Sequence, residues 1–355
     1  MALTPRRSKL AGLECAGAFW VVRSQGDVWA WGSVVGTDGK VTSVTAPTAV
    51  AGLHDVSRIA PASDHACALF RDGTLGCWGN TFGAAIARGN HAATQRLALG
   101  KVPELTEVRD VQIGSFYGCA RVDSGEVHCW GMRDDYFIDK KPRAVPDLGP
   151  TRSFSSGTTQ GCAIRVDGSV GCWGLVHGRI WSYGHAVSGS DDSVRDRAYP
   201  RAVKDAVQVA AAAGHACAVT QGGQVWCWGE AAFGQLGNGK RGSGPANAEF
   251  VPVAVKGIDD ALSVAVHDSA TCAVRKGGSV WCWGNGQRGQ LGVEGRVAAR
   301  TEPAPVPDLT DVERLVTGCG SSKFCAVRRD DSLQCWPWQG KRTPQPAVEV
   351  ATIPP

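Results

Sequence analysis

Residues 217–229 read C-A-V-T-Q-G-G-Q-V-W-C-W-G, with two cysteines ten residues apart and a tryptophan directly after the second. Residues 216–220 and 224–228 alternate in side-chain character on either side of a glycine-containing turn, which predicts a β-hairpin. A seventh copy at 20–32 has Trp20 and Ala30 at the cysteine positions. The six complete copies contain the pairs Cys67 and Cys77, Cys119 and Cys129, Cys162 and Cys172, Cys217 and Cys227, Cys272 and Cys282, and Cys325 and Cys335.

The tryptophan after the second cysteine position divides the chain into seven similar units. Units of roughly fifty residues made of short strands and turns are typical of propeller blades. The 46 glycines and 18 prolines interrupt the chain too often for long helices. A further strand is expected before each hairpin, as at 207–210, and another after it, led by a proline such as Pro47 or Pro252. The seven tryptophans are Trp31, Trp78, Trp130, Trp173, Trp228, Trp283 and Trp336.

The sequence therefore predicts an all-β fold, a seven-bladed β-propeller of four-stranded antiparallel blades. We expect a single domain over 10–351, with an N-terminal tail at 1–9 and a C-terminal tail at 352–355. Both faces of each blade would be covered by neighbouring blades. Disulfides and tryptophans should then alternate through the core between blades, because the second cysteine and its tryptophan point to opposite faces.

The hairpin turn places the two cysteines of each unit opposite each other. In Arg71-Asp72-Gly73 the glycine comes last of three residues, which suits a type I turn closing through a left-handed residue. Counting outward from this turn puts the cysteines at a non-hydrogen-bonded pair, where Cα atoms approach to about 4.5 Å. That separation permits a disulfide in each of the six hairpins.

Two cysteines, Cys15 and Cys319, lie outside the six pairs. They fall near the innermost strands of the first and last blades, so we expect a disulfide between them that closes the ring. Paired cysteines at one fixed position favour an oxidising, extracytoplasmic or secreted location. The alternative is that the cysteines are small core residues of a reduced, cytoplasmic protein. No signal peptide is visible in this chain, and no run of about 18 apolar residues predicts a membrane span.

The pattern G-H-x-x-A-V, G-x-V-x-x-W-G and G-Q-L-G resembles the regulator of chromosome condensation repeat family of seven-bladed propellers. It is carried best by Gly214-His215, Ala218-Val219, Gly223-Gln224-Val225, Trp228-Gly229 and Gly234-Gln235-Leu236-Gly237. The resemblance covers about residues 10 to 350. It implies a propeller face presented to another protein, since the family includes an exchange factor for a small GTPase, a photoreceptor and a secreted inhibitor. The cysteine pairs are similar to those of exported bacterial members.

Partner binding is expected in the connections between third and fourth strands, which vary most in length among the units. One such loop follows Trp173 and another follows Trp130, and both are rich in the aromatic and charged residues common at interface hot spots. A second set of candidates stands two residues before the first cysteine, on the same face. The predicted partner-binding residues are Arg179, Trp181, Tyr183, His185, Arg133, Asp134, Asp135, Tyr136, Phe137, His65, Tyr117, His215 and Lys323.

No motif indicates catalysis, so we expect no enzyme, no catalytic residue, no cofactor and no metal site. Zinc is disfavoured because the sequence has no C-x-x-C and no matching histidine pattern. With 37 Lys and Arg against 33 Asp and Glu, the formal charge is +4 and no basic stripe predicts nucleic-acid binding. We therefore expect a monomeric, non-enzymatic scaffold that binds an unidentified protein through its loop-rich face. The alternative is an intracellular guanine-nucleotide exchange or regulatory factor for a small GTPase.

Overall fold

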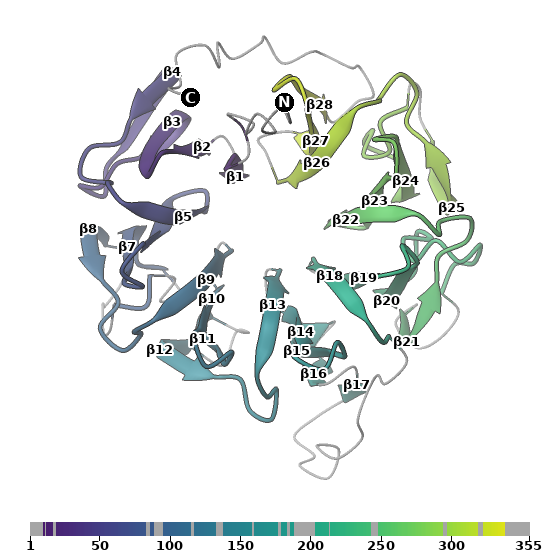
Figure 1. Cartoon of the computed structure of the whole chain (residues 1–355), viewed down its shortest axis with the longest axis horizontal. Coiled ribbons are helices and arrows are strands. Elements are labelled where there is room, and N and C mark those ends of the chain that lie inside the picture. Colours follow the sequence, from purple (N-terminus) through teal and green to yellow (C-terminus); the bar gives the residue numbers. More distant parts are fainter. Residues whose placement is uncertain are drawn as a thin grey trace, which may run out of the picture.

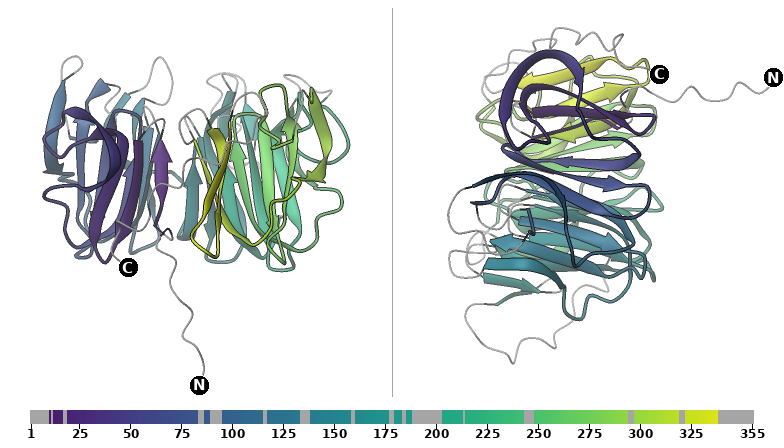
Figure 2. Two further views of the ribbon diagram at one scale, coloured as in Figure 1. Left: turned by 90° about the horizontal axis from the view of Figure 1, so that it is seen from above. Right: turned by 90° about the vertical axis from the view of Figure 1, so that its left-hand side faces the viewer.

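The chain forms a ring of seven antiparallel sheets, which Figure 1 shows as blades around a central axis. In the side views the strands run roughly along that axis (Figure 2). Every regular element among the described residues is a β-strand. The computed structural model describes residues 10, 12–16, 19–82, 86–88, 95–114, 117–132, 138–157, 160–176, 179–182, 185–187, 203–212, 214–242, 248–293, 297–318 and 322–337.

Each blade is numbered from its innermost strand outward. Blade 1 contains β1 (Glu14–Ala16), β2 (Phe19–Ser24), β3 (Asp27–Val35) and β4 (Val41–Ala49). Blade 2 contains β5 (Val56–Pro61), β6 (His65–Phe70), β7 (Leu75–Asn80) and β8 (Arg96–Lys101). Blade 3 contains β9 (Val108–Ile113), β10 (Tyr117–Val122), β11 (Val127–Met132) and β12 (Ile138–Ala144). Blade 4 contains β13 (Thr151–Ser156), β14 (Gln160–Arg165), β15 (Val170–Val176), β16 (Arg179–Ser182) and β17 (His185–Val187).

The remaining blades complete the ring. Blade 5 contains β18 (Ala206–Ala211), β19 (His215–Thr220), β20 (Val225–Glu230) and β21 (Ala248–Ala254). Blade 6 contains β22 (Ala261–His267), β23 (Ala270–Arg275), β24 (Val280–Asn285) and β25 (Ala299–Pro305). The described part of blade 7 contains β26 (Val312–Thr317), β27 (Ser322–Arg328) and β28 (Leu333–Pro337). The prediction of an all-β, seven-bladed propeller is confirmed.

The hairpins follow the turn chemistry that the sequence indicates. Phe70 N donates to Thr74 O at 2.9 Å, Gly73 N donates to Phe70 O at 3.0 Å, and Gly73 has φ of +83°. These contacts define a three-residue turn closed by a left-handed glycine. In blade 7 the same position is occupied by Asp331, at φ +68°. The Asp72 carboxylate accepts hydrogen bonds from the Thr74 N and Oγ1, which lower the pKa of Asp72.

All six cysteine pairs predicted from the repeat form disulfides across these hairpins. Each disulfide joins residues ten apart, with Cα–Cα separations of 4.0–4.1 Å. Such short separations are expected at non-hydrogen-bonded pairs of an antiparallel ladder. The bonds join Cys67 to Cys77, Cys119 to Cys129, Cys162 to Cys172, Cys217 to Cys227, Cys272 to Cys282, and Cys325 to Cys335.

The seventh predicted disulfide, between Cys15 and Cys319, stays a prediction, because Cys319 lies outside the described residues. Cys15 Sγ is 3.6 Å from the backbone oxygen of Thr317. The innermost strand β1 of blade 1 therefore lies against β26 of blade 7, where the ring closes.

The disulfide of each blade packs against the tryptophan of the next blade, as predicted for the core between blades. Cys217 and Cys227 share a buried cluster with Trp283, and Cys67 and Cys77 share one with Trp130. Sulfur and indole surfaces thus fill the space between adjacent sheets. In the remaining clusters Cys119 and Cys129 pack with Trp173, Cys162 and Cys172 with Trp228, Cys272 and Cys282 with Trp336, and Cys325 and Cys335 with Trp31.

In blade 1 the pairing of the two hairpin strands is shifted by one residue from the prediction. Its hairpin turns through Gln25 and Gly26 alone, at φ of +53° and +98°, so Val21 is paired with Ala30 and Trp20 with Trp31. The residues at the cysteine positions are therefore Val21 and Ala30, not Trp20 and Ala30. A two-residue turn needs left-handed dihedrals at both positions, whereas the other hairpins use three residues. The Trp20 and Trp31 rings are stacked, with centroids 6.0 Å apart.

We expect that Val21→Cys combined with Ala30→Cys will form an additional disulfide in blade 1. Both side chains are buried and cross-strand partners, at the register of the native cysteine pairs. Closing this short loop should raise the free energy of unfolding by about 2–3 kcal/mol. Denaturant titration with a free-thiol count measures both outcomes. Trp20→Cys with Ala30→Cys is the control, and it should leave both new thiols free because those positions are not paired.

The position of proline in the outermost strands also differs from the prediction that a proline begins each of them. Proline does not lead them: Pro47 and Pro252 lie inside β4 and β21, and Pro305 ends β25. They remain edge positions, where a missing N–H costs no ladder bond. After Trp173 the chain does not run directly into a long loop, because β15 is followed at once by the short strands β16 and β17.

Candidate binding face and axial charges

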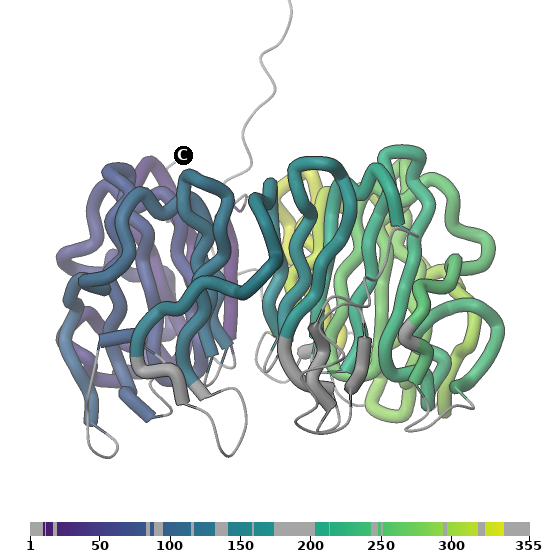
Figure 3. Tube along the Cα trace, turned by 90° about the horizontal axis from the view of Figure 1, so that it is seen from below, coloured from purple at the N-terminus to yellow at the C-terminus, as the bar shows by residue number. Residues whose placement is uncertain are grey.

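The up-and-down strand order sorts the connections onto two faces. The loop-rich face carries the connections from first to second and from third to fourth strands. The hairpin face carries the second-to-third turns and the connections between blades. Gln221 N in a hairpin turn donates to Asp205 O in the connection that enters blade 5, at 2.9 Å, which places both on the hairpin face. Figure 3 views the ring edge-on, with one face above and the other below.

Only some of the predicted loop residues are among the described residues. Arg179 and Trp181 lie in β16 and His185 lies in β17, where Trp181 pairs with Ala186. Lys323 lies in β27. The other predicted loop residues, Tyr183, Arg133, Asp134, Asp135, Tyr136 and Phe137, lie outside the described residues. Binding by these loops stays a prediction.

The other predicted set is not on the surface. His65 and Tyr117 are 1% exposed, and His215 is 0% exposed. The expectation that these three side chains face a partner is corrected, because all three are buried, and the adjacent blade supplies hydrogen-bond partners to Tyr117 and His215. Tyr117 OH accepts a hydrogen bond from Trp173 Nε1 of blade 4 at 2.8 Å, and His65 Nδ1 pairs with Asp64 Oδ1 at 2.9 Å.

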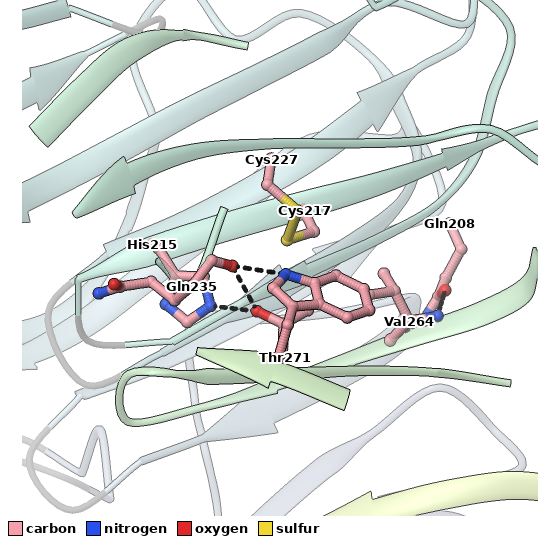
Figure 4. Close-up of a disulfide and its surroundings, with 8 residues drawn as sticks. Gln208, His215, Cys217, Cys227, Gln235, Val264 and Thr271 are labelled. Atoms are coloured by element: carbon pink, nitrogen blue, oxygen red, sulfur yellow. Dashed lines mark hydrogen bonds between the residues drawn. A yellow bond between two sulfur atoms is a disulfide. The ribbon is translucent and has the colours of Figure 1, made fainter. Parts of the chain in front are cut away.

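His215 links blades 5 and 6 through a chain of hydrogen bonds (Figure 4). Its Nε2 lies 2.8 Å from Thr271 Oγ1, which donates to the backbone oxygen of Gln235 at 2.9 Å. The same oxygen accepts a hydrogen bond from Trp283 Nε1 at 2.8 Å. Burial lowers the pKa of His215 to about 4, so its imidazole is neutral at pH 7. The G-Q-L-G segment therefore supplies a carbonyl that holds the next blade's tryptophan, and Gln290 does the same for Trp336.

Charged side chains gather where the innermost strands face the axis. Arg58 of β5 and Asp110 of β9 form an ion pair, with Nε and Oδ1 3.0 Å apart. Arg314 of β26 occupies the same position as Arg58, since each is paired with the residue two after the first cysteine of its blade, Val327 and Leu69. Glu14 of β1 belongs to blade 1, which lies between the two arginine-bearing blades. The blades opposite carry neutral polar residues at this register: Ser153, Gln208 and Ser263. At this register the innermost strands of blades 2, 3 and 7 thus carry charged residues, and those of blades 4, 5 and 6 carry neutral ones.

The charges of this cluster partly compensate one another. Burial raises the pKa of Glu14, and the nearby Arg58 and Arg314 oppose that shift. Burial likewise raises the pKa of Asp110 and lowers that of Arg314. The described residues contain no group of three or more histidine, cysteine or acidic side chains placed to hold a metal ion. Arg58, Asp110 and Arg314 are the third residues of β5, β9 and β26, so aligning these strands would have revealed three of the charges in the sequence, whereas Glu14 is the first residue of β1.

We expect Glu14→Gln to raise the free energy of unfolding at pH 7. A carboxyl whose pKa is higher in the folded than in the unfolded chain stabilises the fold only while it is protonated. That contribution is complete below the ordinary glutamate range and is lost as pH rises through the folded pKa. Denaturant titrations from pH 4 to pH 8 should show the two proteins converging at low pH and separating above it. Glu302→Gln, at an exposed ion pair with Lys256, should show no comparable separation.

Within the described part of the chain, no helix is long and apolar enough to cross a membrane. The architecture is that of a disulfide-bonded seven-bladed propeller. Models of the regulator of chromosome condensation repeat match residues 222–274 and 277–327, and a second model of this repeat matches 206–235 and 263–290. Residues 206–327 therefore contain repeats of the regulator of chromosome condensation type.

Two relatives show how far the similarity extends. The RCC1 domain-containing mitochondrial protein RUG3 of Arabidopsis thaliana is 27% identical over 319 residues, which cover 84% of this chain and 71% of that protein. The E3 ubiquitin-protein ligase HERC2 of Homo sapiens is 30% identical over 140 residues, 38% of this chain. This chain spans only 3% of the length of that ligase.

Two solved structures share the fold. Prp20p from Saccharomyces cerevisiae has a TM-score of 0.70 at 18% identity, covering 90% of this chain and 82% of that one. Human WBSCR16 has a TM-score of 0.68 at 19% identity, covering 91% and 88%. At these identities the similarity establishes the propeller architecture.

Proposed function

We propose that this chain is a non-enzymatic scaffold that binds a partner protein through its loop-rich face, outside the cytoplasm. The main support for this proposal is that the disulfide-bonded hairpins are alike in six blades, whereas the connections between third and fourth strands differ from blade to blade. Six disulfides hold six hairpins in one geometry, with Cα separations that differ by only 0.1 Å. The third-to-fourth connections differ among the blades, and the described part of blade 4 has five strands where blades 1, 2, 3, 5 and 6 have four. A rigid scaffold with variable loops is a common basis for recognition.

A described aromatic residue supports this face. Phe82 follows β7 in the third-to-fourth connection of blade 2, and its side chain is 50% exposed. An exposed phenylalanine gains more from burial in an interface than a polar residue does. Phe82 was not among the predicted residues because only the loops after Trp130 and Trp173, rich in aromatic and charged residues, were considered. Phe82 therefore joins Trp181 and Tyr183 as a proposed contact.

The compartment is supported by the cysteines. Disulfides at one repeated position are expected in oxidising locations and are rare in a reducing cytoplasm. Prp20p, whose structure is described together with its binding to Gsp1p and histones, has the same fold. A role as an intracellular exchange or regulatory factor is therefore the alternative. A free-thiol count on protein from its native compartment separates the two, because the alternative requires reduced cysteines.

We expect Phe82→Ala to weaken capture of the partner at least tenfold while leaving the unfolding midpoint unchanged, since the side chain is half exposed. Trp181→Ala with Tyr183→Ala should have a similar effect. The measurement is affinity capture from the protein's native compartment, followed by a binding titration with the captured protein. Val166→Ala is the control, because Val166 is 59% exposed in a turn on the hairpin face. Equal losses with Val166→Ala and Phe82→Ala would contradict the loop-rich face.

A further inference from the structure

A cavity of about 500 Å³ opens on the hairpin face of blade 5. One wall is the indole of Trp226, which is partly buried, and the rim carries polar and charged groups. The lining residues include Lys204, Asp205, Thr220, Gln221, Gln224 and Trp226. This surface is separate from the loop-rich face of the proposed function.

The corresponding place in blade 6 is filled by the protein itself. The guanidinium carbon of Arg275 lies 4.9 Å from the ring centroid of Trp281, a cation–π contact. Arg275 Nε lies 2.5 Å from Asp260 Oδ1, and its Nη2 lies 3.5 Å from Asp259 Oδ1. An indole face and two carboxylates therefore hold one guanidinium group.

Strand register establishes which residues of the two blades correspond. Arg275 is paired with Ala261 at the end of β23, and Thr220 is paired with Ala206 at the end of β19. Trp281 and Trp226 each pair with the alanine that follows the first cysteine, Ala273 and Ala218.

The connections entering the two blades correspond as well. Lys276 N donates to Asp260 O, and Gln221 N donates to Asp205 O, both at 2.9 Å. Asp205 is therefore the counterpart of Asp260. Blade 5 has the tryptophan and the aspartate of the blade 6 arrangement, but threonine in place of the arginine.

We propose that the blade 5 cavity binds the guanidinium group of an arginine side chain supplied by a partner polypeptide. The group stacks on Trp226 and pairs with Asp205, as Arg275 does with Trp281 and Asp260. The amide oxygens of Gln221 and Gln224 are further acceptors on the rim. A planar guanidinium suits this site better than an ammonium, because it can stack on the ring while donating at its edge.

The positive charge of Lys204 should weaken guanidinium binding at this site. Lys204 stands where blade 6 has Asp259, so blade 5 offers one carboxylate instead of two, beside a positive charge. The indole and Asp205 must then supply most of the attraction, which predicts weak binding that depends on ionic strength. Lys204→Asp should restore the second carboxylate and tighten binding about tenfold.

The test is calorimetric titration with the amidated peptide Gly-Gly-Arg-Gly-Gly at low salt. The matched ligand carries citrulline, which has the shape of arginine but no charge, and should bind at least about tenfold more weakly. Free arginine is the third ligand: tighter binding of the peptide indicates a polypeptide partner, whereas equal binding indicates that only the guanidinium is recognised. Equal binding of the citrulline and arginine peptides would overturn the proposal.

Two variants test the correspondence between blades. Thr220→Arg should fill the cavity from within, as in blade 6, and abolish peptide binding without lowering the unfolding midpoint. Arg275→Thr should empty the blade 6 site and raise the stoichiometry from one peptide to two. Unchanged binding by Thr220→Arg, or an unchanged stoichiometry with folded Arg275→Thr, would each contradict a guanidinium site at these positions.

Discussion

Replacing Cys217 by valine and Cys227 by alanine should lower the free energy of unfolding by about 2–3 kcal/mol, the loop-closure contribution of one short disulfide. This pair of residues is the one that blade 1 uses, where Val21 and Ala30 occupy the same register without a disulfide. In blade 1 they pack against Trp78, just as Cys217 and Cys227 pack against Trp283. The substitution therefore retains an apolar pair of native type and removes mainly the covalent bond.

Denaturant titration under non-reducing conditions measures this loss. Under reducing conditions the wild-type protein should unfold at lower denaturant, because all six hairpins then lose their cross-links. The single variant Cys217→Ala is the control: it leaves a free thiol and should be at least as unstable as the double variant. If the double variant is as stable as the wild type, the cysteines act as core residues and the inference of an oxidising compartment loses its physical basis.

The repeat predicted the fold well because turn and strand geometry are local. Three residues ending in glycine between two cysteines determine which positions lie opposite, and the Cα separations of 4.0–4.1 Å follow from that count. Blade 1 was misassigned because its register was counted from the cysteine spacing of the other blades. The dipeptide Gln25-Gly26 was the available signal, since a two-residue turn shifts the pairing by one.

The candidate site was harder to predict because it depends on contacts between blades. His215 and Tyr117 stand at the start of second strands, where a single blade would expose them. The neighbouring blade supplies Thr271 and Trp173, which bury and bond them. The pocket at Trp226 also needs comparison between blades, because its chemistry becomes clear only beside Arg275. Side-chain burial of this kind is set by tertiary neighbours rather than by local pattern.

Ring closure is where this propeller depends most on single side chains. Leu10 and Leu13 are connected to blade 7 through Arg314, whose Nη2 donates to Leu10 O at 2.7 Å and to Leu13 O at 2.8 Å. Leu10 and Leu13 are buried with Val316 and Val327 of blade 7. The same guanidinium faces the Glu14 carboxyl, which burial would otherwise leave without compensation.

We expect Arg314→Leu to lower the free energy of unfolding by about 3–5 kcal/mol, because two hydrogen bonds donated by a buried guanidinium are lost. The backbone oxygens of Leu10 and Leu13 each lose the hydrogen bond from Arg314, and Glu14 loses a nearby cation at pH 7. Hydrogen exchange should therefore rise first in residues 10–16 and in β26. Adding Glu14→Gln should recover part of the loss, because it removes the uncompensated charge. Arg109→Leu, which breaks an exposed ion pair with Asp123, should cost less than about 1 kcal/mol. A similarly small loss for Arg314→Leu would show that apolar packing alone closes the ring.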